Sequence, residues 1–343
     1  MSPSLRSNQA AALASDTLEG LPKALRALGV KVTVVVPMSD DVRETGLMLA
    51  RRLTKIETPA GVKAVLHEGR LANQADLAVL ELPEGQHDSF ASVAGAYAAV
   101  KGLTAVYTVS ADGTDVNAID AGAWNPATDP KLAHRYNPFR LWAKKMNQGL
   151  LAEELGMTPD AALPFFLVWA DASSEQFAKE LVAAGLKYPA QWLVCTPAAD
   201  TGLVASWFSE LGDAVKVVVE RSDDQIRRAL GSATLMVWAR GSACPTSLAL
   251  RALRYGTIPV LPAACGGAWT VNIDPAAQSG NAVSFGAMEN DGAGEALVRA
   301  LALTMLPAWE SLQRRAMSWE SGWEREARAL KRRFGGNTVE AAV

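Results

Sequence analysis

The amino-acid sequence predicts an α/β protein that is built on a doubly wound parallel sheet and divided into two domains. Short apolar runs of strand length alternate with stretches of helical periodicity through much of the chain. A segment containing Pro126, Pro130 and Pro138 interrupts this alternation and has the composition of a linker. The 343 residues, of which 49% are hydrophobic, are enough for two buried cores.

Residues 1–120 are expected to form a first, shortened domain. Leu21 to Leu28 is predicted to be a helix, with Pro22 in its first turn and Gly29 at its end. Val30 to Val36 is a nearly continuous β-branched run, which is typical of a central parallel strand. Further strands are predicted at residues 62–66, 78–82 and 104–110, and a further helix at residues 91–100.

After a linker at residues 121–138, a second domain is expected at residues 139–306. Helices are predicted at residues 141–155, 175–184, 203–211, 224–230 and 247–255. Apolar strands are predicted between them, at residues 164–169, 191–195, 215–219, 233–239 and 257–261. This order indicates right-handed βαβ units and a doubly wound sheet.

The C-terminal residues 307–334 are predicted to form one long helix. Spacings of three and four place seven residues on one face of it: Trp309, Leu312, Ala316, Trp319, Trp323, Ala327 and Leu330. We expect this face to pack in the core, and a platform on which a glucan stacks is the alternative. Residues 335–343 are expected to be a disordered tail.

Charge and composition exclude several classes of function. A formal charge of −3 gives no reason to expect nucleic acid or a membrane as a partner, and no apolar run is long enough to span a membrane. The three cysteines, Cys195, Cys244 and Cys265, form no C-x-x-C pair, and the three histidines lie far apart. We therefore expect no metal site and no cofactor. Residues 1–14 lack the apolar core of a signal peptide, so the expected location is cytoplasmic.

The segment from Ala252 to Gly267 is the best candidate for a ligand site. It predicts a helix, a stop at Gly256, a short buried strand and then a turn at Cys265, Gly266 and Gly267. In parallel sheets, ligands bind beyond the carboxyl ends of the strands, near turns of this kind. The turn is therefore a candidate for holding the diphosphate of a nucleotide sugar, and a turn without a ligand is the alternative.

Four segments of the chain resemble one family in the correct order. They are Gly20 to Gly29, Ile119 to Pro130, Ala252 to Val260 and Trp309 to Trp319. The first is similar to the opening of bacterial glycogen synthases and plant starch synthases, the second to their interdomain signature, and the last two to their C-terminal motifs. The resemblance covers nearly all of residues 120–330 but only fragments before them.

The resemblance implies a GT-B type fold, in which two Rossmann-like domains face each other across a cleft, here with a truncated N-terminal domain. It also implies the transfer of glucose from ADP-glucose to an α-1,4-glucan with retention and without a metal. In this chemistry, positive side chains and backbone amides stabilise the departing diphosphate.

The positions that carry this chemistry in the family differ here. The family's N-terminal lysine corresponds to Ala10, its arginine to Ala170, and its glutamate to Ala243. The lysine that follows the arginine corresponds to Ser174 or Glu175. Because loss of a single oxyanion donor costs ~10²–10³ in turnover, the sequence predicts a retained scaffold without its catalytic groups.

Three hypotheses follow. The first is a catalytically degenerate homologue that acts as a binding or assembly partner of an α-glucan or of an active glycogen synthase. The second is an active glucosyltransferase in which Arg240, Arg251 and Arg254 replace the missing cations; ion pairing on helix surfaces or between domains is the alternative role for these arginines. The third is a protein that binds a sugar nucleotide, ADP-glucose or UDP-glucose, or an oligosaccharide. A dimer or hetero-complex is expected, because the shortened first domain exposes a sheet edge.

Overall fold

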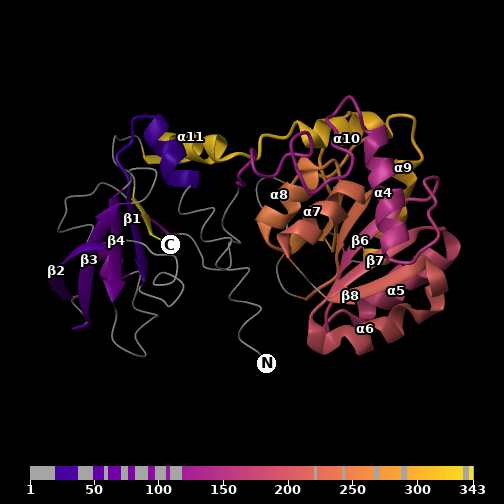
Figure 1. The fold of residues 1–343 in the computed structure, drawn as a ribbon, viewed down its shortest axis with the longest axis horizontal. Coiled ribbons are helices and arrows are strands. Elements are labelled where there is room, and N and C mark those ends of the chain that lie inside the picture. The colour runs from indigo at the N-terminus through magenta and orange to yellow at the C-terminus, as the bar shows by residue number, and fades with distance from the viewer. Residues whose placement is uncertain are drawn as a thin grey trace. The chain divides into compact units, whose positions relative to one another are not determined.

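The computed structural model describes residues 20–37, 49–57, 61–70, 76–81, 92–96, 106–108, 118–219, 222–241, 244–265, 270–286, 292–334 and 340–342. The chain divides into two compact units, whose elements are labelled in Figure 1. The first unit contains residues 1–120 together with residues 321–343, and the second contains residues 121–320. The C-terminal segment therefore belongs with the N-terminal one.

A six-stranded mixed sheet forms the first unit, in the order β2-β3-β4-β1-β12-β5. Its strands are β1 (Thr33–Pro37), β2 (Leu49–Glu57), β3 (Lys63–Arg70), β4 (Asp76–Glu81), β5 (Val106–Thr108) and β12 (Glu340–Ala342). The β1 strand is parallel to β4 and β12, whereas β2, β3 and β4 pair antiparallel. The valine run thus forms a central strand as predicted, and β2 was not predicted.

The prediction of a disordered tail at residues 335–343 is wrong for residues 340–342. These residues form β12 between β1 and β5, with Val34 opposite Ala341 and Val35 opposite Ala342. The backbone of β1 is buried and needs hydrogen-bond partners on both sides, which β4 and β12 provide. The remaining tail residues lie outside the described part of the chain.

A helix at residues 20–27 packs against α11 (Trp323–Phe334) in the first unit. A Cβ atom at Gly20 would lie 2.1 Å from Nε1 of Trp323, so only glycine fits below this indole. Lys331 donates a hydrogen bond from Nζ to the carbonyl oxygen of Leu28, at 2.7 Å. Packing against α11 therefore explains why residue 20 is a glycine.

The second unit contains a six-stranded sheet in which every strand is parallel to its neighbours, in the order β11-β10-β9-β6-β7-β8. Its strands are β6 (Phe165–Trp169), β7 (Gln191–Thr196), β8 (Val215–Val219), β9 (Leu235–Trp238), β10 (Ile258–Pro262) and β11 (Val283–Phe285). All residues of β6 and β9 are buried, as expected for central strands. The doubly wound sheet is confirmed, although β11 was not predicted.

Helices cover both faces of this sheet. The helices are α4 (Trp142–Glu154), α5 (Glu175–Lys187), α6 (Thr201–Phe208), α7 (Asp223–Ser232), α8 (Thr246–Arg254), α9 (Ala293–Thr304) and α10 (Trp309–Met317). On one face α5 contacts α6 and α9, and on the other α4 contacts α7 while α8 contacts α10. Gly256 ends α8 with φ of 65° and directs the chain into β10, as the sequence predicted.

The prediction of one helix over residues 307–334 is wrong, because α10 and α11 are separate. The backbone N–H of Ile119 donates to the carbonyl oxygen of Ser321 at 2.8 Å, so that oxygen pairs with an extended segment. Serine and glycine, which dominate residues 318–322, are also poor helix formers. Leu312 is consequently buried in the second unit and Trp323 in the first.

Candidate functional site

The C-terminal edge of the second sheet is where a parallel sheet normally binds its ligands. Three segments follow strands at this edge: residues 170–174 after β6, residues 239–241 after β9, and residues 263–265 after β10. The strand pairing β10-β9-β6 brings the three segments to neighbouring positions. The side chains of these three segments therefore determine what this edge can bind.

The loop after β6 presents no basic group. Ala170 is fully buried, and its N–H donates to the carbonyl oxygen of Cys195 at 3.1 Å. Ser174 is also buried at the start of α5, where its Oγ accepts the N–H of Asp171 at 2.8 Å. Glu175 is exposed and pairs with Lys179 at 2.7 Å. The position expected to carry the family's arginine thus holds a methyl group, and the position expected to carry its lysine holds either a hydroxyl or a carboxylate.

A carboxylate, Asp171, connects this loop to the one after β9. Its Oδ1 accepts the N–H of Ser173 at 2.9 Å, and its Oδ2 lies 3.9 Å from Nε of Arg240. Ser173 Oγ accepts the N–H of Gly241 at 2.9 Å, which joins the two loops a second time. Arg240 also lies over the ring of Trp238, and its side chain is 11% exposed. The charge of Arg240 is therefore offset by a carboxylate in the same site.

The turn after β10 is described only up to Cys265, because the candidate residues Gly266 and Gly267 lie outside the described residues, as do Ala10 and Ala243. The sulfur of Cys265 accepts the N–H of Cys244 at 3.2 Å. Burial, followed by the proximity of Cys265, raises the pKa of the Cys244 thiol well above its ordinary value. Cys244 is thus a neutral buried thiol and not a nucleophile.

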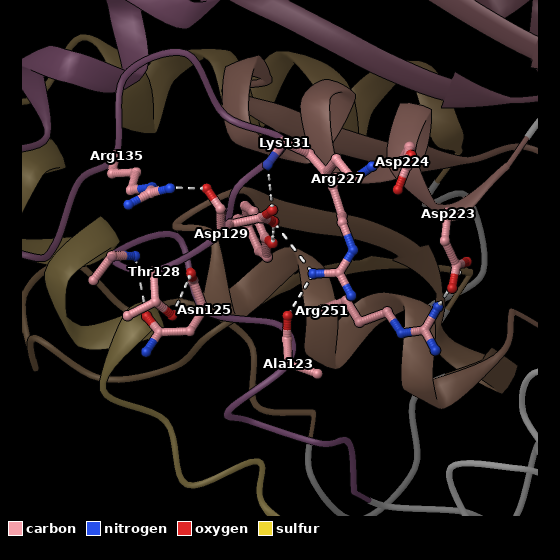
Figure 2. A network of polar contacts seen from close by, with 12 residues as sticks. Ala123, Asn125, Thr128, Asp129, Lys131, Arg135, Asp223, Asp224, Arg227 and Arg251 are labelled. Carbon is pink, nitrogen blue, oxygen red and sulfur yellow. Dashed lines mark hydrogen bonds and ion pairs between the residues drawn. The ribbon is translucent and has the colours of Figure 1, made fainter.

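The second candidate arginine, Arg251, lies against the linker and not at the strand edge. Trp124 is buried, and the guanidinium groups of Arg227 and Arg251 each lie 3.9 Å from its ring centroid. Figure 2 shows Arg251 directed toward Asp223, with which it forms an ion pair at 3.7 Å. Arg251 therefore anchors the linker tryptophan to α7 and α8.

Asp129 anchors the same linker through a buried carboxylate (Figure 2). Its Oδ2 accepts hydrogen bonds from the hydroxyl of Tyr255 and from Nη1 of Arg227. Burial and this hydrogen bond raise the pKa of the Tyr255 phenol. The segment that resembles the family's interdomain signature is thus a structural part of the second unit.

The third candidate, Arg254, bonds to backbone carbonyls. Its Nη1 donates to Met317 at 3.3 Å and its Nη2 to Ala121 at 3.5 Å. Burial lowers the pKa of this guanidinium, which nevertheless stays charged at neutral pH. The structure does not bring the three candidate arginines together: Arg240 alone of the three lies at the strand edge.

One buried cation was not predicted from the sequence. Lys144, on α4, donates from Nζ to the carbonyl oxygen of Leu230 at 2.6 Å, to Thr257 Oγ1 at 2.8 Å and to the carbonyl oxygen of Tyr255 at 3.0 Å. Burial lowers the pKa of its ammonium group well below the ordinary value. Lys144 is buried, so it ties α4 to α7 and to the turn between α8 and β10 and does not face a ligand.

No group of three or more histidine, cysteine, aspartate or glutamate side chains in the described part of the chain is placed to hold a metal ion. None of the helices described in the structure has the length and apolar character needed to cross a membrane.

The chain is similar in sequence to bacterial glycogen synthases. The glycogen synthase of Serratia proteamaculans is 31% identical over 222 residues, which cover 61% of this chain and 46% of that protein. The glycogen synthase of Roseobacter denitrificans is 29% identical over 226 residues, with coverage of 62% and 47%. No family model matches the chain. The chain therefore spans about half the length of the curated relatives that it matches.

A solved structure shares the fold. The catalytic domain of starch synthase IV from Arabidopsis thaliana, bound to ADP and acarbose, superimposes with a TM-score of 0.61 at 13% sequence identity. The match covers 90% of this chain and 99% of that one. The resemblance stated from the sequence is thereby confirmed, and the fold is that of the GT-B glycosyltransferases.

Proposed function

We propose that this chain, a glycogen synthase-like member of the GT-B glycosyltransferases, is a catalytically degenerate homologue that acts as a binding or assembly partner in α-1,4-glucan metabolism. The observation that carries the proposal is the pairing of Asp171 with Arg240 at the C-terminal edge of the second sheet. Arg240 follows β9 at this edge, and the Asp171 carboxylate, which follows β6, lies beside it.

The electrostatics of glucosyl transfer support this proposal. A departing nucleoside diphosphate accumulates negative charge, and an enzyme accelerates its departure with positive groups that are already in place. Here the loop after β6 offers Ala170 and Ser174, both buried, and Asp171 faces the same edge. A carboxylate near the diphosphate disfavours both its binding and its departure.

An active retaining glucosyltransferase, which moves glucose from ADP-glucose to an α-1,4-glucan, is the second candidate function. The position of Arg240 favours this function. The charge of Arg240 acts to lower the pKa of the Cys244 thiol, and the N–H of Cys244 donates to the sulfur of Cys265. Cys265 begins the turn where the sequence predicts a diphosphate, so Arg240 and this turn share Cys244 as a neighbour. Binding of a sugar nucleotide or an oligosaccharide without transfer is the third candidate, which shares the same turn.

Transfer of labelled glucose separates the first two functions. The full chain is incubated with ADP-glucose or UDP-glucose and glycogen, beside an Arg240→Ala variant and an Arg314→Ala control, since Arg314 pairs with Glu310 on the exposed surface of α10. A degenerate homologue gives the same background incorporation with all three proteins. Incorporation that Arg240→Ala abolishes and Arg314→Ala leaves intact would overturn the proposal in favour of an active enzyme.

Binding measurements separate the remaining functions. A glucan-binding protein is retarded by glycogen in affinity electrophoresis, and an assembly partner co-purifies with an intact glycogen synthase. A nucleotide-sugar binding protein releases heat with ADP-glucose or UDP-glucose in titration calorimetry but is not retarded by glycogen. If the chain shows neither retardation nor co-purification, the proposed partner function is wrong.

A further inference from the structure

The outer face of α4 carries a stripe of exposed apolar side chains. Trp142, Met146 and Leu150 follow one another at intervals of four residues, so they lie on one side of the helix. They are 63%, 43% and 44% exposed, and Phe139, just before the helix, is 81% exposed. The residues that attach α4 to the second unit lie on its other side: Ala143, Lys144, Asn147, Gln148, Leu151 and Ala152. A continuous apolar patch of this kind is characteristic of an interaction surface.

Charged residues on this face are arranged so that two copies of it are complementary. Lys145 and Glu153 are exposed, and neither has an ion-pair partner among the residues that the structure describes. Gly149 lies midway between them, and the space beside its Cα is open. In an antiparallel pair of α4 helices with a two-fold axis at Gly149, Lys145 of each copy meets Glu153 of the other. The glycine allows the two backbones to approach closely at the axis.

The exposed area of the stripe is sufficient for such a contact. Phenylalanine and tryptophan bury roughly 150–250 Å² each when they are covered. With the exposures given above, the four side chains offer on the order of 500 Å² in one copy and about 1,000 Å² in a pair. That area reaches the lower limit for a specific protein–protein interface.

We propose that the chain forms a homodimer in which two α4 helices pack antiparallel through Phe139, Trp142, Met146 and Leu150. Lys145 and Glu153 form two symmetric ion pairs at the border of this contact. The dimer rests on the α4 surface alone and does not depend on whether the C-terminal edge of the sheet binds a nucleotide sugar.

Sedimentation of the full chain at 1–100 µM tests the proposal. We expect a monomer–dimer equilibrium, whose dissociation constant rises roughly 10- to 100-fold in Met146→Glu, because each copy then buries a carboxylate against an apolar surface. Leu203→Glu is the matched control, since Leu203 is 48% exposed on α6 and lies outside the stripe. A chain that is monomeric at 100 µM, or a dimer that Met146→Glu does not weaken, overturns the proposal.

Charge exchange and cross-linking identify the second copy as the occupant of the stripe. Lys145→Glu weakens the dimer, and the double variant Lys145→Glu/Glu153→Lys restores it, because the exchanged charges attract again across the axis. Oxidation of Gly149→Cys gives a covalent dimer, and oxidation of Leu203→Cys gives none. If the double variant stays as weak as the single one and Gly149→Cys does not cross-link, the helices do not pack in this way; if only another protein covers the stripe, the homodimer is wrong.

Discussion

Replacing Asp171 by asparagine removes the carboxylate that lies beside Arg240 at the C-terminal edge of the second sheet. The two groups are 3.9 Å apart, and their side chains are 24% and 11% exposed. At this separation two unit charges interact by about 4 kcal/mol when the effective dielectric constant is 20. Water at the partly exposed carboxylate reduces that value, so we expect Asp171→Asn to improve the binding of ADP by roughly 1–2 kcal/mol, or about 5- to 30-fold in Kd.

The asparagine retains one oxygen that can accept the N–H of Ser173, so we expect the loop to keep its conformation. Titration calorimetry with ADP compares the wild type, Asp171→Asn and the double variant Asp171→Asn/Arg240→Ala. If the Asp171→Asn variant binds ADP more tightly because Arg240 loses its carboxylate partner, the double variant does not show this improvement. The reasoning is refuted if Asp171→Asn binds ADP no better than the wild type, or if the double variant keeps the improvement.

Three predictions concern stability, measured by urea unfolding. Trp124→Ala destabilises the chain by about 3–5 kcal/mol because it empties the buried site between two arginines. Tyr188→Ala, on the exposed surface and outside the α4 stripe, changes stability little, and similar losses in the two variants would contradict the role of the linker. Tyr255 has a raised pKa when folded, and the unfolded phenol ionises near pH ~10, so stability falls as pH rises above that value; the fall is smaller in Tyr255→Phe. Gly20→Ala costs about 1–3 kcal/mol through its clash with an indole, and Gly95→Ala, in a helix with open space, costs nothing.

The parts of the fold that were predictable are those in which local sequence and tertiary packing agree. The strands β6 and β9 are apolar over their whole length and are buried on both faces, so their composition alone identifies them. Gly256 has a positive φ and ends its helix where the sequence placed the stop. The local sequence is therefore sufficient to predict these elements, although their hydrogen-bond partners lie far away in the chain.

The elements that were missed depend on contacts between distant segments. The strand β12 consists of Glu-Ala-Ala and has no strand signal of its own; β1 and β5 supply its hydrogen-bond partners. The break between α10 and α11 arises where Ile119 binds Ser321, although the apolar spacing continues across it. Spacing indicates which residues are buried but not which core receives them.

At the candidate site, the sequence predicts that cations are missing, but it does not predict the pairing of Asp171 with Arg240. Ala170, at the position where the resemblance leads us to expect an arginine, is buried. The proximity of Asp171 to Arg240 could not be predicted from the sequence, because these residues follow two strands that are neighbours only in the folded sheet. Lys144 was missed because a lysine on a helix is usually exposed. Its position four residues before the buried Gln148 was the available signal.

The most direct test is the transfer of labelled glucose from ADP-glucose to glycogen by the full chain, measured beside Arg240→Ala. If the site lacks the cations that glucosyl transfer requires, both proteins give incorporation equal to that of a sample without protein. Incorporation by the wild type that is lost in Arg240→Ala would contradict the account, because it would show that this arginine stabilises a departing diphosphate in spite of Asp171.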